Sequence, residues 1–262
     1  MQHAEQAGLS AADLNFNPPQ FSQAALADAL GRHYGLAGSL HPLDGERDQN
    51  HRVSCADGRE FVFKVSSPGE APGAVDFQIG ALQHLANSAP ELAVPRLLPS
   101  LTGNTREWIE DAAGTRHMIR LLSWLPGEPL SSGSALEPAI FRSAADFQAR
   151  LAQGLRGYFH PHARHFVAWD IQRALVLDPG VQARVQPDAR ALAAGFLERL
   201  PTEVLPRLPV LRAQVVHSDG HTGNLLRPTA ASQTVNGVID FGDMVHAPLV
   251  QDLAVMIASF LR

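Results

Sequence analysis

The chain has 262 residues, of which 45% are hydrophobic and 18% charged, and its formal net charge is −5. This length suits one large domain or two lobes that share a cleft, and the absence of basic runs argues against a nucleic acid polymer as partner. The single cysteine, Cys55, cannot form an internal disulfide, and we expect a cytoplasmic location. We expect neither a signal peptide nor a membrane partner, because the longest apolar run, near Leu253 to Leu261, is too short to cross a bilayer.

An arm and a first helix open the chain. Residues 1–20 are weakly patterned and form the arm. Apolar residues then recur at helical spacing up to Tyr34, and Ser22 or Gln20 can cap the start of that helix. Gly35 is expected to end it.

A strand-rich segment follows and completes a first lobe over residues 1–125. The Asp57-Gly58 pair is typical of a hairpin turn, because glycine supplies the positive φ that the turn needs. One helix, over residues 75–86, is predicted inside this segment. The predicted strands cover residues 39–43, 51–55, 60–65, 105–109 and 117–122.

A second, mainly helical lobe is predicted over residues 126–262. Asp188 is the expected N-cap of one of its helices, and Pro201 the expected end. Another short helix is expected to begin at Trp169-Asp170. The longer predicted helices cover residues 140–155, 188–200 and the segment after Pro248.

The most informative stretch runs from His217 to Asn224 and resumes at Asp240. Two short apolar runs, joined by a polar loop, predict a β-hairpin that places Asn224 beside Asp240, with Asp219 just upstream. The oxygens of Asn224 and Asp240 can hold a hard cation such as Mg²⁺, with phosphates and water completing its shell. Asp219 can then accept a proton from a substrate hydroxyl, as in phosphoryl transfer.

These motifs resemble the aminoglycoside phosphotransferase/choline kinase family. The Asp-x4-Asn spacing and the run Ile239-Asp240-Phe241-Gly242 carry the resemblance, which covers roughly Leu43 to Leu261. It implies an α+β, two-lobed protein-kinase-like fold, with an antiparallel sheet and a helix in the first lobe. It also implies transfer of the γ-phosphoryl group of ATP, with Mg²⁺, to a hydroxyl of a small molecule.

The resemblance is greatest to the hydroxylysine-kinase-like branch, whose acceptors are hydroxylated amines or amino acids. The run Gly-Glu-x-Asp-Gln-Asn over residues 45–50 supports this, although it lacks the three glycines of a typical phosphate loop. In such a fold this loop covers the nucleotide phosphates. Its residues proposed to bind the cofactor are Gly45, Glu46, Asp48, Gln49 and Asn50.

The resemblance assigns roles to further residues. Lys64 is the only lysine of the chain and stands in an apolar strand, where it would hold the phosphates. The alternative without a functional role is an edge-strand lysine that faces solvent. Ser123 and Leu125 would belong to the hinge that faces the adenine, unless they simply end a strand. Gln78 stands where the family has a glutamate, so we predict that Lys64 lacks a carboxylate partner. His217 would brace the catalytic loop that carries Asp219.

Several alternatives stay open. The hairpin could be an ordinary one. His217, Asp219 and His221 could bind a transition metal, although the glycines at 220 and 223 indicate a loop rather than a strand. A metal could also bind the histidines at 160, 162 and 165, but their spacing around Pro161 suits no common zinc site.

The end of the chain raises a further alternative. The sequence stops at Arg262 inside a helical pattern, where kinases of the family continue with helices that wall the acceptor pocket. The chain could therefore be an inactive nucleotide-binding module of a longer or fused polypeptide. A protein Ser/Thr kinase is less favoured, because no Ala-Pro-Glu follows Gly242. The oligomeric state is left open.

Overall fold

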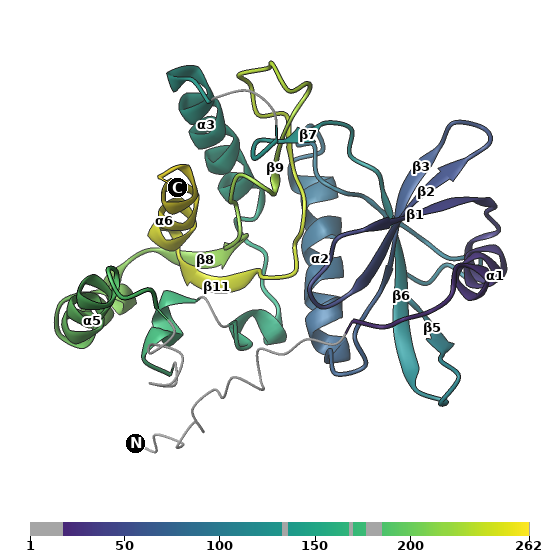
Figure 1. Cartoon of the computed structure of the whole chain (residues 1–262), viewed down its shortest axis with the longest axis horizontal. Helices are drawn as coiled ribbons and strands as arrows, with labels where there is room; N and C mark the ends of the chain where they lie inside the picture. The colour runs from purple at the N-terminus through teal and green to yellow at the C-terminus, as the bar shows by residue number, and fades with distance from the viewer. Residues whose placement is uncertain (1–17, 133–135, 168–169, 177–184, 262) are drawn as a thin grey trace.

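The structure is a computed structural model that describes residues 18–132, 136–167, 170–176 and 185–261. An antiparallel sheet dominates its N-terminal part and helices its C-terminal part, with α2 (Pro72–Ser88) lying between the two (Figure 1). This confirms the predicted α+β class. The predicted arm over residues 1–17 and Trp169 lie outside the described residues.

The N-terminal sheet contains six antiparallel strands in the order β1-β2-β3-β6-β4, with β5 also paired to β6. The five predicted strands are all found, within two residues at each end. Gly58 has a φ of 84° in the β2–β3 turn, as predicted. The strands are β1 (Gly38–Leu43), β2 (Gln49–Cys55), β3 (Glu60–Val65), β4 (Leu97–Leu98), β5 (Glu107–Glu110) and β6 (Arg116–Ser123).

The alternation of β3 decides what each face of the sheet does. Phe63 and its neighbours at 61 and 65 pack against α1 (Gln23–Tyr34) in one buried cluster. Val62 and Lys64 point to the opposite face, toward α2 and the cleft. Helix α1 begins as predicted, since the Ser22 hydroxyl accepts a hydrogen bond from the N–H of Ala25.

The C-terminal part begins soon after β6. Strand β7 (Glu128–Pro129) already pairs with β9 in a second, three-stranded sheet of order β10-β9-β7, and β8 pairs with β11. Its remaining elements are β8 (Ala213–Val216), β9 (Leu225–Arg227), β10 (Gly237–Val238), β11 (Val245–Pro248), α3 (Pro138–Gly154), α5 (Arg190–Arg199), α6 (Leu249–Phe260), η1 (Pro161–Arg164), η2 (Ile171–Val176), η3 (Leu200–Val204) and η4 (Leu205–Val210).

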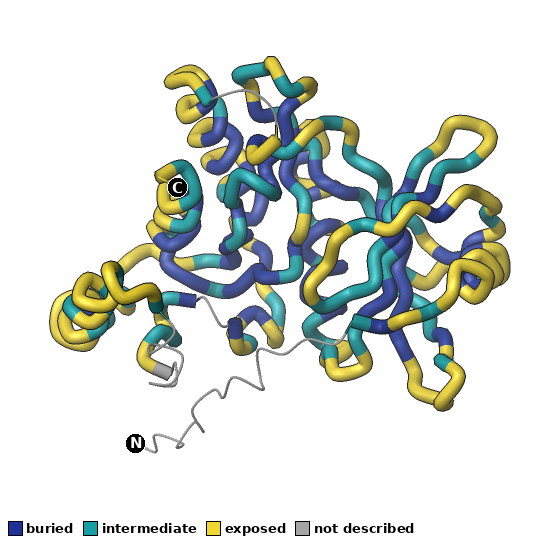
Figure 2. Tube along the Cα trace, in the orientation of Figure 1, coloured by how far each residue is buried: buried dark blue, intermediate teal, exposed yellow. Residues whose placement is uncertain are grey.

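Helix α5 corrects the predicted cap and confirms the predicted end. Its N-cap is Ala189 and not Asp188, so the start of the helix has no side-chain cap. Pro201 ends the α-helix but not the turning chain, which continues as the π-turn η3 and the 3₁₀ turn η4. Proline lacks a backbone N–H. At the start of a helical turn that N–H would have no partner within the turn, so Pro201 can begin η3 without losing a hydrogen bond. Figure 2 shows that α5 is mostly exposed, and none of its residues is buried.

No helix among the described residues is both long and apolar enough to cross a membrane.

Candidate active site

The catalytic hairpin has the predicted geometry. Strand β9 pairs antiparallel with β10, and the pairing continues outward where the N–H of Ile239 donates to the carbonyl of Asn224 at 3.0 Å. The start of the first strand therefore lies beside the end of the second. Asn224 and Asp240 consequently line the same two cavities.

Asp219 and Asn224 are bonded to each other. The Nδ2 of Asn224 donates to the carboxylate of Asp219 at 2.7 Å and to its backbone carbonyl at 3.0 Å. Because the amide nitrogen is used in this way, the Oδ1 of Asn224 remains as a ligand atom. Asn224 Oδ1 and the Asp240 carboxylate are hard oxygen donors in one cavity, which suits Mg²⁺ that keeps phosphate and water ligands.

Two residues at this site have left-handed backbone conformations. Ser218 has a φ of 64° and Asp240 a φ of 60°. Such strain is maintained only when the surrounding structure holds it. For Ser218 the holder is Asp252, whose Oδ1 accepts the Ser218 N–H at 2.7 Å and so ties the loop down.

His217 links the loop that carries Asp219 to the strand end that precedes Asp240. Its Nδ1 accepts the N–H of Asp219 at 3.3 Å, and its Nε2 lies 3.1 Å from the carbonyl of Ile239. The side chain is fully buried, and burial lowers the pKa of His217, so the ring is neutral at pH 7. The neutral ring therefore carries its proton on Nε2 and donates to Ile239.

A transition-metal site finds no support in the described residues. Both ring nitrogens of His217 are already engaged, and the Nδ1 of His221 accepts the N–H of Gly223 at 2.9 Å. Within the described ranges, no group of three or more His, Cys, Asp or Glu side chains is placed to hold a metal. The histidines at 160, 162 and 165 are among these residues.

The carboxylates at this site differ in acidity. Burial, followed by the charges of Asp243 and Asp240, raises the pKa of Asp219 to about 7. The ammonium of Lys64 is the largest influence on Asp240 and lowers the pKa of that carboxyl despite its burial. Asp240 is therefore ionised at neutral pH, whereas Asp219 lies near the pKa at which a general base is most effective.

The partner of Lys64 corrects a prediction. Lys64 was expected to lack a carboxylate, but its Nζ lies 3.5 Å from the Oδ2 of Asp48. Gln78 contacts Arg120 and Glu70 instead, at 2.8 Å and 3.1 Å. The expected acid would come from helix α2, whereas the acid that pairs with Lys64 comes from the loop over the cleft. The acid at position 76 faces away and pairs with Arg106.

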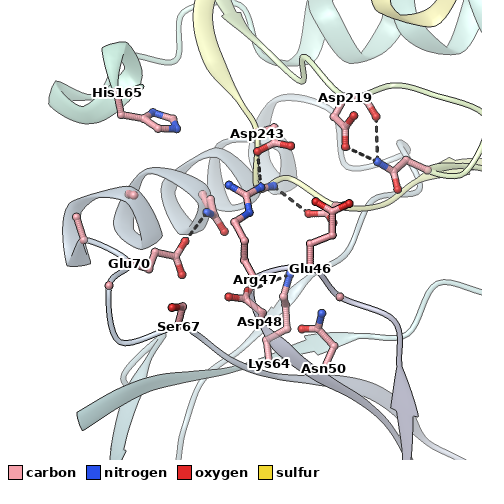
Figure 3. A pocket seen from close by; sticks show the side chains of 18 of the residues that line it. Glu46, Arg47, Asp48, Asn50, Lys64, Ser67, Glu70, His165, Asp219 and Asp243 are labelled. Atoms are coloured by element: carbon pink, nitrogen blue, oxygen red, sulfur yellow. Dashed lines mark hydrogen bonds and ion pairs between the residues drawn. The ribbon is translucent and has the colours of Figure 1, made fainter. Parts of the chain in front are cut away.

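The loop over residues 45–50 forms one wall of the larger cavity. Gly45 is required there, since a Cβ would lie 2.5 Å from Asn50 Nδ2 and 2.7 Å from the carbonyl of Asp48. Glu46, Asp48 and Asn50 also line the cavity (Figure 3). Gln49 does not line either cavity. Successive side chains of a strand point to opposite faces, so Gln49 points away from the face that Asn50 occupies at the start of β2. The amide of Gln49 is bonded to the backbone of Phe21.

Two cavities meet at Lys64, Asn224 and Asp240. The larger, of about 760 Å³, is lined mainly by charged and polar residues, among them Asp219 and Asp243. The smaller, of about 450 Å³, has a largely apolar lining that reaches the predicted hinge. Its walls include Val62, Leu82, Leu122, Ser123, Leu125, Leu226 and Phe241. This arrangement can hold a flat apolar base in one cavity and direct its phosphates into the other.

Three side chains of this cleft, Arg47, Arg120 and Asp243, were not predicted from the sequence. Arg47 donates across the cleft to the carboxylate of Asp243. Arg120 lies buried on β6 and contacts Gln78, Ser66 and Asp48. A signal for Arg120 existed, because it is a charge inside an apolar strand, as Lys64 is. Arg47 and Asp243 stand in polar loops, where charged residues are common and do not indicate a functional site.

Comparison with known proteins agrees with this geometry. The model of the phosphotransferase enzyme family (APH) matches residues 39–262, so the chain belongs to that family. Among curated proteins, the chain is 29% identical over 252 residues to hydroxylysine kinase of Danio rerio, covering 91% of the chain and 70% of the relative. The corresponding protein of Mus musculus is 25% identical over 262 residues, covering 91% and 69%. The chain is accordingly a small-molecule kinase.

Solved structures confirm the protein-kinase-like fold. An amicoumacin kinase in complex with AMP-PNP, Ca²⁺ and amicoumacin superposes with a TM-score of 0.70 at 17% identity, covering 92% of this chain and 70% of that one. A microcompartment-associated aminopropanol kinase also gives 0.70, at 18% identity, covering 90% and 74%. Complexes of related enzymes with nucleotides support use of a nucleotide by the family.

Proposed function

We propose that the chain transfers the γ-phosphoryl group of ATP to a hydroxyl of a small hydroxylated amine or amino acid, using Mg²⁺. The observation that carries the proposal is the convergence of Asp219, Asn224 and Asp240 with Lys64 at the junction of two cavities. Catalysis of this kind consists mainly of positioning and of neutralising charge on the phosphates. We place the activity in the cytoplasm, where the free thiol of Cys55 would stay reduced.

Each residue has a distinct task in this proposal. Asn224 and Asp240 would hold Mg²⁺, which when bound neutralises phosphate charge. Lys64 would hold the phosphates from the N-terminal sheet. Asp219 would orient the acceptor hydroxyl and take its proton as the phosphoryl group arrives, and His217 would keep the Asp219 backbone in place.

The charge of the larger cavity favours a cationic acceptor. Besides Asp240, its acidic lining residues are Asp44, Glu46, Asp48, Glu70, Asp219 and Asp243. The cationic side chains there are Arg47 and Lys64, and each already has a carboxylate partner. An ammonium group on the acceptor would therefore find complementary charge. The curated relatives, named for hydroxylysine, support the same class of acceptor.

An acceptor panel tests the proposal. The protein with Mg·ATP would be offered 5-hydroxylysine, 1-amino-2-propanol, ethanolamine and an aminoglycoside, and ADP release would be measured. L-lysine is the matched control, because it differs from hydroxylysine only in lacking the hydroxyl. We expect turnover with at least one hydroxylated amine and none with lysine. A melting shift with Mg·ATP but no turnover on any acceptor would instead support an inactive nucleotide-binding module.

A further inference from the structure

Lys64 and Arg120 are direct neighbours on the cleft face of the N-terminal sheet. They are paired with each other in the antiparallel register of β3 and β6, and both line the smaller cavity. Like charges directly opposite each other on adjacent strands repel. An anion between them is therefore needed to keep both cations in place.

Asp48 is that anion. Its Oδ2 lies 3.5 Å from the Nζ of Lys64 and 3.4 Å from the Nη2 of Arg120. The side chains of Lys64, Asp48 and Arg120 are only 14%, 12% and 4% exposed. Water screens such a cluster far less than it screens a surface ion pair. Figure 3 shows Asp48 beside Lys64 on the floor of the cavity.

Arg120 is anchored on its other sides. Its guanidinium donates to the hydroxyl of Ser66 at 2.8 Å and to the Oε1 of Gln78 at 2.8 Å. Its Nη1 also lies 4.0 Å from a carboxylate oxygen of Glu70. Arg120 is thus fixed to helix α2 and to the connection before it. Asp48 in contrast belongs to the loop that walls the larger cavity.

We propose that Asp48 is the acidic partner of Lys64 in this chain and that Arg120 is the positioning residue that holds Asp48. The loop over the phosphates and the lysine that binds them then form one electrostatic unit. Gln78 serves only as an uncharged link between Arg120 and Glu70. The inference rests on the proposed function, because it takes Lys64 to contact the phosphates of ATP.

A double-mutant cycle tests this coupling. The dissociation constant of Mg·ATP would be measured for the parent, Asp48→Asn, Lys64→Met and the double variant, with circular dichroism as a check of folding. We expect each single change to raise the dissociation constant about tenfold, the effect of losing one charge-assisted contact. Because Asp48 acts through Lys64, the double variant should bind within about twofold of Lys64→Met.

A matched control separates this role from a general loss of charge. Asp76→Asn removes a carboxylate from the same part of the chain, where it pairs with Arg106 at 2.8 Å outside both cavities. Its affinity for Mg·ATP should equal that of the parent. If Asp48→Asn bound like the parent while Lys64→Met was impaired, or if the two effects multiplied, the partner assignment would be overturned.

Arg120→Lys provides a second route if Asp48→Asn does not fold. Lysine keeps the charge but cannot contact Ser66, Gln78 and Asp48 at once. It should weaken Mg·ATP binding in the parent and leave binding unchanged in the Lys64→Met background; an equal loss in both would contradict the proposal. If Lys64→Met bound Mg·ATP as tightly as the parent, the role of Lys64 in the proposed function would fail first, and the inference with it.

Discussion

The carboxylate of Asp252, on α6, accepts a hydrogen bond from the backbone N–H of Ser218 at 2.7 Å. Ser218 is one of the two non-glycine residues with positive φ in the described part of the chain, and it directly precedes Asp219. The other oxygen of the same carboxylate accepts from Gln148 on α3. One buried acid therefore holds a strained residue of the catalytic loop and ties that loop to two helices.

Asp252→Ala should destabilise the fold strongly. The change leaves the Ser218 N–H and the Gln148 amide buried without partners, which costs about 2–4 kcal/mol in the free energy of unfolding. Urea denaturation measures this loss. Asp146→Ala, on the exposed side of α3, is the control and should change the value by less than about 0.5 kcal/mol. Equal stability of the two variants would mean that Asp252 does not hold the loop.

Asp240→Asn should remove the metal dependence of nucleotide binding and leave the fold intact. Asparagine is chosen because it tolerates the left-handed backbone at this position, whereas alanine would add strain. The melting temperature of the parent should rise with Mg·ATP and rise less when EDTA is added. For the variant, the shift should be small and the same with or without EDTA. A full Mg²⁺-dependent shift in the variant would show that the metal lies elsewhere.

Lys64 offers a chemical test, because it is the only lysine in the sequence. An amine-directed reagent can modify only this side chain and the N-terminal amine. If Lys64 contacts the phosphates, Mg·ATP should slow its modification several-fold, as measured by mass spectrometry of the peptide that contains it. The N-terminal amine serves as the internal control and should react at the same rate throughout. Unchanged labelling of Lys64 would restore the view that it is an ordinary strand residue.

Turnover should depend on the ionisation of Asp219. The pKa of this carboxyl is raised to about 7 by burial and by the charges of Asp243 and Asp240, so its basic form is lost as the pH falls through that range. Turnover should therefore decrease on the acid side. Asp243→Asn removes one of the two charges, which lowers the pKa of Asp219 and should move the acid limb to lower pH. Asp57→Asn, in an exposed turn, should leave the limb in place, and an unmoved limb in Asp243→Asn would count against Asp219 as the base.

Local patterns were enough to predict most of the elements that build the cleft. The strand over residues 60–65 and the turn glycine at 58 depend on neighbouring residues alone, and both predictions are confirmed. The hairpin that joins Asn224 to Asp240 was predictable for the same reason, because a short connection leaves few ways to pair two strands. The pairing of Asp219 with Asn224 then follows from their separation in one loop.

Long-range charge pairing could not be predicted in this way. Asp48 stands in the loop before β2 and Lys64 in β3, and nothing in their spacing shows that the register of β3 and β6 places Arg120 beside them. Arg47 and Asp243 are 196 positions apart. The cap expected at Asp188 failed for a different reason. A cap is a weak local preference, and α5 has no buried face that would fix where the helix begins.

Asp219→Asn tests the central claim most directly, because it keeps the size and hydrogen-bonding oxygen of the side chain but cannot accept the proton. The parent and the variant would be compared for Mg·ATP affinity and for turnover on an acceptor identified with the panel. We predict the same affinity, since Asn224 and Asp240 are untouched, and a decrease in turnover of about 10²- to 10⁴-fold. Equal turnover in the two proteins, with the affinity unchanged, would contradict the role of Asp219 and the mechanism built on it.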